Sequence, residues 1–435
     1  MISARVFILI AMIIKQIYNI VLQRMADIQR KKPLPEEVAD VYDAKRYMTY
    51  LDYTADTKKL CNKFKLIDFF VECVLIFSPI YAYIDTISGG NPYGTFFLTY
   101  AIIWVIGMVT DTWASYDVTF KILEKYEINK KTKKEFVKDL VLEQSLSLFL
   151  VIIISIVVIY IGEHMAQWTN NYSVGYAKSL VICVAVSALF FIIICIAKLL
   201  SYAVIRKQYT FTPMKECELK CKINRLQEHS KKKVKEIYVY DESKKTTTKN
   251  AFLLKLFWHR EFGIADNFMN ENSENELLAV LSHEIGHLKH KKNILNFISY
   301  GMIALFAAFV VYIIANPSLC LIINGWIRES FNIADANYYL YFVVYSYFVT
   351  PIMFGVGIFH SYKSKYEEYE ADREAVKNGY SNDLIKTFKA LSADELVNVN
   401  PHPFIEFTEY DHPGMYRRIK AIKQAQDSLA RMEER

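Results

Sequence analysis

Seven stretches of about 20 mostly apolar residues restrict the fold of this chain more than any other feature, because that length lets an α-helix cross the hydrocarbon core of a bilayer. They lie at Ile2–Leu22, Leu66–Ile87, Gly94–Trp113, Val141–Gly162, Ser179–Val204, Ile294–Ala315 and Tyr339–His360. The first carries Lys15, but no small-residue cleavage site follows it, so we interpret it as a helix rather than as a secretory signal. The sequence therefore predicts a mainly α-helical, polytopic membrane protein.

The composition excludes several other classes of protein. Hydrophobic residues make up 53% of the 435 residues, and only 14 Gly and 10 Pro are present, which is typical of neither disordered nor collagenous chains. Seven Cys are an odd number and do not indicate a disulfide-rich secreted domain. The net charge of +6 comes from 52 basic residues scattered among 46 acidic ones, so we expect no nucleic-acid partner.

The charges of the loops predict how the chain is oriented in the membrane, because Lys and Arg are retained on the cytosolic side. Ten basic residues lie between Arg24 and Lys65, and seven between Lys121 and Lys138. The alternate loops have none at 88–93, one at 163–178 and one between the last two stretches. We therefore expect a non-cytosolic N-terminus and a cytosolic C-terminus. The triplet at Asn171 is a possible glycosylation acceptor on the non-cytosolic side.

The segment between the fifth and sixth stretches predicts a small β-sheet followed by a helix. Val234–Tyr240 alternates as a half-buried strand does, and Asn250–Phe257 and Phe262–Asp266 resemble further strands. Ser273 and Glu276 then form a capping box, in which each side chain satisfies a free backbone amide of the other residue. A helix is expected from this box to about residue 292.

That helix contains the motif His283-Glu284-x-x-His287. Two His four residues apart project from one helical face and can bind the same metal ion. Glu284 is placed to take a proton from a water molecule whose pKa zinc lowers to about 7. Two solvated His on a surface helix are the alternative, but the apolar neighbours of the motif indicate a buried helix, and buried imidazoles need partners.

A catalytic zinc needs a third protein ligand, and the segment 366–375 offers one. Glu368 and Asp372 are four residues apart, so one can bind the metal while the other orients a ligand His. A solvated acidic helix face stays open as an alternative. We expect His290 to be a solvated residue or to interact with the helix dipole rather than to bind metal, and the pair Cys217 and Cys221 is a weak indication of a structural zinc.

The pairing of HExxH with a later ExxxD, each beside an apolar stretch, resembles the type I CAAX prenyl proteases, which are integral-membrane zinc peptidases. The resemblance extends over nearly the whole chain, in order. It includes Lys32-Pro33-Leu34-Pro35, the run from Phe211 to Met214, Asn250-Ala251-Phe252 and the run from Tyr410 to Arg418. It implies seven transmembrane helices enclosing a chamber, with a gluzincin-like zinc protease domain on the cytosolic side.

The resemblance also implies roles for individual residues. His283, His287 and Glu368 would bind one zinc ion per chain, and Asp372 would orient a ligand His. Glu284 would be the general base. His412 and Arg418 would stabilise the oxyanion or the C-terminal end of the substrate, whereas Asn250 and Ala251 would pair with an extended substrate along an edge strand.

The expected organisation has four parts. These are 1–205 with five helices and cytosolic loops, 206–293 with the strands and the HExxH helix, 294–361 with two more helices, and 362–435 with the third ligand.

The function that the resemblance implies is removal of the C-terminal AAX tripeptide from prenylated CAAX proteins. The membrane would be the endoplasmic reticulum in a eukaryote or the plasma membrane in a bacterium. The alternatives are a quality-control metalloprotease that needs no prenyl group, a catalytically inactive scaffold and a transporter.

Overall fold

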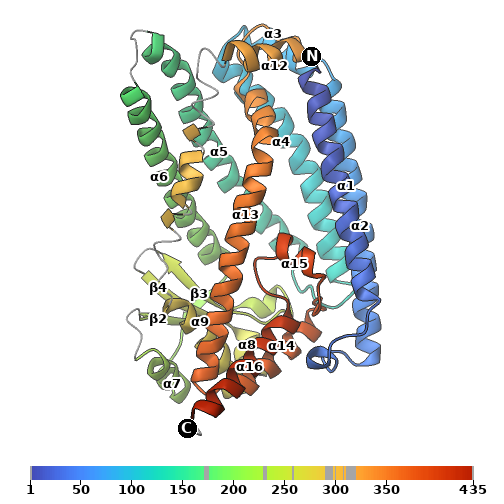
Figure 1. Cartoon of the computed structure of the whole chain (residues 1–435), viewed down its shortest axis with the longest axis vertical. Helices are drawn as coiled ribbons and strands as arrows, with labels where there is room; N and C mark the ends of the chain where they lie inside the picture. Colours follow the sequence, from blue (N-terminus) through green and yellow to red (C-terminus); the bar gives the residue numbers. More distant parts are fainter. Residues whose placement is uncertain are drawn as a thin grey trace.

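Long helices form an extended bundle, one end of which carries a small sheet and a group of shorter helices (Figure 1). The computed structural model describes residues 2–170, 176–228, 233–256, 259–289, 297–298, 300–306, 308–309 and 320–433. The N-terminus lies at the end of the bundle away from the sheet, and the C-terminus lies beside the shorter helices.

The bundle confirms the prediction of a multi-pass helical membrane protein. Its helices are α1 (Ala4–Arg30), α2 (Ala44–Phe77), α3 (Ile80–Ser88), α4 (Pro92–Asp117), α5 (Lys133–Asn170), α6 (Tyr176–Gln208) and α13 (Tyr338–Lys377). Five of the described helices are long and apolar enough to cross a membrane, and a sixth span is added if α2 and α3 count as one. The stretch Ile294–Ala315 falls largely outside the described residues, as do Asn171 and His290. Seven spans and an enclosed chamber therefore stay predictions.

The stretch Leu66–Ile87 differs from the single straight helix that we expected. The chain turns by 54° between α2 and α3, at Ser78 and Pro79. Proline lacks the backbone N–H that would continue the helical hydrogen bonds, and its ring clashes with the preceding turn. The local sequence therefore causes the break.

Polar residues begin several of the long helices. The side chain of Asp43 accepts a hydrogen bond from Arg46 N at 2.7 Å, and Asn91 and Asn337 act similarly at the starts of α4 and α13. Such caps satisfy backbone amides that have no partner within the helix. α13 then continues without interruption for 40 residues, from the bundle into the group of shorter helices.

The sheet has four strands in the order β1-β2-β4-β3. β2 (Glu236–Tyr240), β3 (Ala251–Leu256) and β4 (His259–Ala265) confirm the three predicted strands, whereas β1 (Phe211–Pro213) was not predicted. β2 and β4 are parallel, and β3 and β4 are antiparallel. β3 is therefore an edge strand, with β4 as its one neighbour among the described strands.

Most of the shorter helices lie beside this sheet, toward the lower end of the molecule in Figure 1. They are α7 (Glu218–Leu226), α8 (Asp266–Glu271), α9 (Glu274–Lys289), α14 (Ser381–Asp394) and α16 (Met415–Glu433). α15 (Pro403–Glu409) lies higher, between α1 and α13, and α12 (Gly325–Phe331) lies beside α3 at the opposite end of the bundle (Figure 1). Single turns occur at Glu36–Val38, Val118–Leu123, Glu242–Lys244 and Cys320–Asn324.

α9 is held between the sheet and α13. Phe262 and Ile264 of β4 belong to the same fully buried cluster as Leu281 and Ile285 of α9. The predicted capping box begins the helix, because Ser273 N donates to Glu276 Oε2 at 2.8 Å and Glu276 N donates to Ser273 Oγ at 3.4 Å. The apolar side of α9 thus packs on the sheet, and its opposite side is left to meet α13.

Candidate active site

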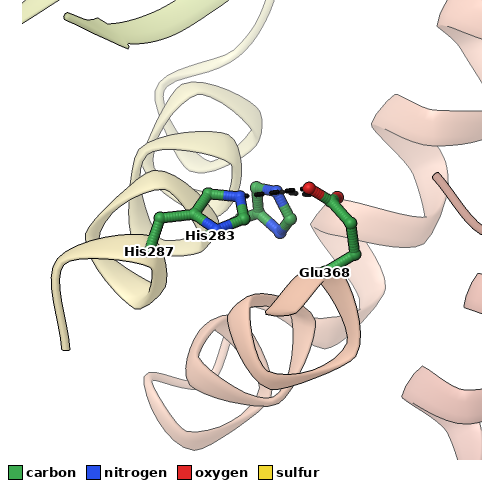
Figure 2. Close-up of side chains that lie close together, drawn as sticks. All are labelled: His283, His287 and Glu368. Atoms are coloured by element: carbon green, nitrogen blue, oxygen red, sulfur yellow. Dashed lines mark ion pairs between the residues drawn. The ribbon is translucent and has the colours of Figure 1, made fainter. Parts of the chain in front are cut away.

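His283 and His287 project from α9 toward Glu368 on α13 (Figure 2). His283 Nε2 lies 3.5 Å from Glu368 Oε2, and His287 Nε2 lies 3.3 Å from Glu368 Oε1. The side chains of His283 and Glu368 are 8% and 7% exposed. Residues from two distant parts of the sequence therefore form one compact, largely buried group.

The three side chains fit a metal ion. Their ligand atoms all lie within 4.8 Å of one another, and this is the one such group of three found in the described part of the chain. Zinc binds imidazole nitrogen and carboxylate oxygen at about 2.0–2.2 Å with tetrahedral geometry, which separates the donor atoms by roughly 3.3 Å. The observed nitrogen–oxygen distances match that separation. Two imidazoles and one carboxylate are also a donor set that zinc prefers.

Asp372 orients the first of the two His. Its Oδ1 lies 2.9 Å from His283 Nδ1, on the side of the ring away from Glu368. A proton on Nδ1 donates to this carboxylate, which leaves the lone pair of Nε2 directed at Glu368 and the position for a metal. Asp372 is 2% exposed, so this contact is shielded from water.

Arg418, on α16, lies behind this pair. Its Nε and one terminal nitrogen donate to the two oxygens of Asp372 at 3.0 and 2.6 Å, and the same terminal nitrogen lies 3.3 Å from Glu368 Oε2. Burial lowers the pKa of Arg418, but the neighbouring carboxylates, Asp372 above all, outweigh it and raise the pKa. The guanidinium therefore compensates two buried negative charges.

His412 approaches from the loop between α15 and α16. Its Nδ1 lies 3.2 Å from Glu368 Oε1, while 59% of its side chain is exposed. The hydrogen bond with Glu368 raises the pKa of His412, and burial opposes this effect. His412 thus contacts a candidate metal ligand and is also accessible to solvent.

The remaining predicted residues lie on α9 and at the start of β3. Glu284 follows His283 on α9 and is half-buried. Asn250 is exposed and directly precedes β3, and its carbonyl accepts a hydrogen bond from Ala265 N at 2.9 Å. Ala251 begins β3 and pairs with Ile264. The predicted strand-pairing residues therefore lie at the start of the edge strand.

Gly286 was missed by the sequence reasoning. A Cβ built on Gly286 would lie only 2.6 Å from the Cα of Ala371, so the backbones of α9 and α13 touch at this point. Gly286 lies between His283 and His287 in the sequence, and Ala371 lies between Glu368 and Asp372. Position 286 is three residues after His283, on a neighbouring part of the same helical surface, and the missing side chain at that position was the available signal.

A helical bundle with this buried group defines a multi-pass membrane metallopeptidase, and comparisons with known proteins specify the family. Residues 213–426 match peptidase family M48, and residues 24–201 match the family described as CAAX prenyl protease N-terminal, five membrane helices. The chain belongs to the CAAX prenyl protease family of M48 metalloproteases.

Individual relatives agree with this assignment. The chain is 26% identical to the CAAX prenyl protease 1 homolog of Arabidopsis thaliana, over 75% of this chain and 72% of the relative. It is 31% identical to the probable CAAX prenyl protease 1 of Schizosaccharomyces pombe, over 70% of this chain and 60% of the relative. The crystal structure of S. mikatae Ste24p superposes with a TM-score of 0.79 at 21% identity, covering 97% of this chain and 99% of that chain. This last likeness shows the same fold.

Proposed function

We propose that the protein is a zinc endopeptidase that removes the last three residues from prenylated CAAX proteins. The observation that carries the proposal is the group of His283, His287 and Glu368, because a chain that binds the metal with these side chains has the donor set of a hydrolytic zinc site. The prenylated substrate is inferred from the names of the relatives, and the membrane helices offer a lipid phase from which such a substrate can enter.

The residues of the site divide the chemistry between them. One zinc ion, held by the three ligands, would polarise the scissile carbonyl and lower the pKa of a water molecule. Glu284 takes a proton from the attacking water and delivers it to the leaving amine, as the peptide C–N bond breaks and a new carboxylate forms. His412 donates to the oxygen that becomes negative at the carbonyl. Water is consumed, and no covalent bond to the protein forms.

Arg418 is proposed to position the site rather than to contact the substrate. Its contacts with Asp372 and Glu368 support a role in holding His283 and the carboxylate ligand in place. Without this buried cation, the negative charges of Asp372 and Glu368 would be buried close together and less well compensated, which is unfavourable.

The edge strand is proposed to hold the substrate. An extended peptide would add to the free edge of β3 through backbone hydrogen bonds near Asn250 and Ala251. Strand addition reads the backbone more than the side chains, so it suits a protease whose clients share a modified C-terminus.

The test is cleavage of a farnesylated CAAX peptide by the detergent-purified protein, with and without a zinc chelator. The proposal is supported if the protein releases the last three residues and the chelator stops this release. Zinc analysis should give one ion per chain. Glu284→Gln should bind zinc and lose cleavage, whereas Glu274→Gln, at the start of the same helix, should keep both. Cleavage of an unlipidated twin peptide in place of the farnesylated one would favour the quality-control alternative.

The orientation remains as the loop charges predict, with the N-terminus outside the cytosol and the C-terminus and active site on the cytosolic side. We place the protein in the endoplasmic reticulum of a eukaryote or in the plasma membrane of a bacterium. Protection of a C-terminal tag from added protease in sealed vesicles with the cytosolic side outward would contradict this orientation.

A further inference from the structure

α15 is a short helix that the catalytic scheme does not use, although two contacts connect it to the active site. It lies between α1 and α13 in Figure 1, and it contacts both helices. Lys365 of α13, one turn before Glu368, donates to the backbone carbonyls of Glu406 and Phe407, the latter at 3.3 Å. Three residues after the end of α15 comes His412, which contacts Glu368.

One side of α15 is firmly held. The carboxylate of Glu406, which is 3% exposed, lies 3.2 Å from Arg417 Nε of α16. The hydroxyl of Tyr18, from α1, donates to Glu409 Oε1 at 2.6 Å. The ring of Tyr18 in turn packs edge-on against Phe354 of α13, with 6.0 Å between the ring centroids. Three helices therefore fix the orientation of this short element.

The other side of α15 carries two aromatic rings that are partly exposed. Phe404 is 41% exposed and Phe407 is 50% exposed. Because they are three residues apart on a helix, they lie on one face.

We infer that Phe404 and Phe407 form the binding surface for the isoprenoid chain of the substrate. This inference rests on the proposed function, in which the scissile bond follows the prenylated cysteine, so the start of the isoprenoid must lie beside the metal ligands. Lys365 is one helical turn, about 5 Å along the axis, from Glu368, and α15 is bonded to it. A farnesyl chain extends over roughly 15 Å and reaches α15 from that starting point.

The occupant is identified by reach and by chemistry. An isoprenoid is a flexible apolar chain with π bonds, and it gains from contact with aromatic faces that water otherwise covers. The peptide part of the substrate is proposed to pair with the edge of β3, so the two surfaces would hold two parts of one substrate. Simple contact of the two rings with bilayer lipid is the competing explanation, and it predicts no preference between substrates.

The kinetic test compares a farnesylated CAAX peptide with its S-methylated twin, using the zinc-loaded protein and the variant Phe404→Ala/Phe407→Ala. For the farnesylated peptide we expect kcat/KM to fall about tenfold or more, mainly through KM, because two aromatic contacts are lost. The S-methylated peptide should be cleaved at an unchanged rate. Phe342→Ala is the matched control, because Phe342 is 61% exposed on α13 but lies about 39 Å along the helix from Glu368.

A second measurement keeps the inference testable if the double variant fails to fold. A farnesylated peptide with a photoreactive group in the isoprenoid, bound to Glu284→Gln, should crosslink to residues 403–410. Crosslinks confined to other segments, or a folded double variant that keeps the farnesyl preference, would overturn the inference. If the unmodified protein cleaves neither peptide, the proposed function itself fails, which is a distinguishable result.

Discussion

Substitution of Gly286 by Ala tests how the metal site is held together. In an exposed helix interior this change stabilises by about 1 kcal/mol, because Gly has the greater conformational freedom in the unfolded chain. Here the added Cβ would lie 2.6 Å from the Cα of Ala371 and 3.1 Å from its carbonyl oxygen. Both contacts are with backbone, so no side chain can rotate away, and the sign of the effect is expected to reverse.

The magnitude follows from the separation that the methyl group requires. Raising the 2.6 Å approach to an ordinary contact of 3.4 Å needs about 0.8 Å between α9 and α13. The ligand pairs are 3.3 and 3.5 Å apart across the same two helices, and metal geometry tolerates deviations of only about 0.2 Å. We expect zinc affinity to fall about 10- to 100-fold and the folded state to lose about 1–3 kcal/mol through overpacking.

The assay is zinc competition with a chromophoric chelator, together with thermal unfolding in detergent with and without zinc. Gly357→Ala on α13 is the control, because no atom lies within 4 Å of a Cβ built there. If Gly286→Ala bound zinc as tightly as the unmodified protein and unfolded at the same or a higher temperature, the reasoning from the helix contact would be refuted.

Three further changes concern charged groups. Burial raises the pKa of Glu276, but the hydrogen bonds with Ser273 and Lys386 outweigh burial and lower the pKa to about 2. Glu276→Gln should therefore destabilise the metal-free protein by about 1 kcal/mol at pH 6. This difference should vanish as the pH falls from about 4.5 toward 2. Burial, with a smaller contribution from a neighbouring carboxylate, raises the pKa of Glu395 to about 7, so the folded protein loses stability as the pH rises through 7. Glu395→Gln should therefore unfold at a higher temperature than the unmodified protein at pH 8, but not at pH 4.5. Arg418→Gln should weaken zinc binding about tenfold or more in chelator competition, because it removes a cation from two buried carboxylates.

Each of these outcomes can be contradicted. Glu216→Gln, at a side chain that is 81% exposed, is the control for both glutamate changes and should leave the pH dependence of unfolding unaltered. A Glu276→Gln protein that matched the unmodified protein at pH 6, or a Glu395→Gln protein that was less stable at pH 8, would oppose the stated signs. Unchanged zinc affinity in Arg418→Gln would show that the guanidinium does not support the metal ligands.

The sequence by itself determined the features that arise within a dozen or so residues. Apolar stretches specified the helices of the bundle, alternation specified β2, strand-like runs specified β3 and β4, and Ser273 with Glu276 specified the start of α9. The spacing of His283 and His287 also placed both imidazoles on one face. These features depend on the periods of helix and strand, which the local chain expresses wherever it packs.

Only the tertiary structure decided which distant groups meet. Arg418 and His283 are 135 residues apart, and no local pattern shows that the guanidinium lies behind the His–Asp pair. The strand β1 is three residues long and exists because β2 offers it a partner. The contact of Gly286 with Ala371, and the place of α15 between α1 and α13, likewise follow from how completed helices pack. Packing is set by the shapes of whole surfaces, and those surfaces are formed by segments that the sequence keeps far apart.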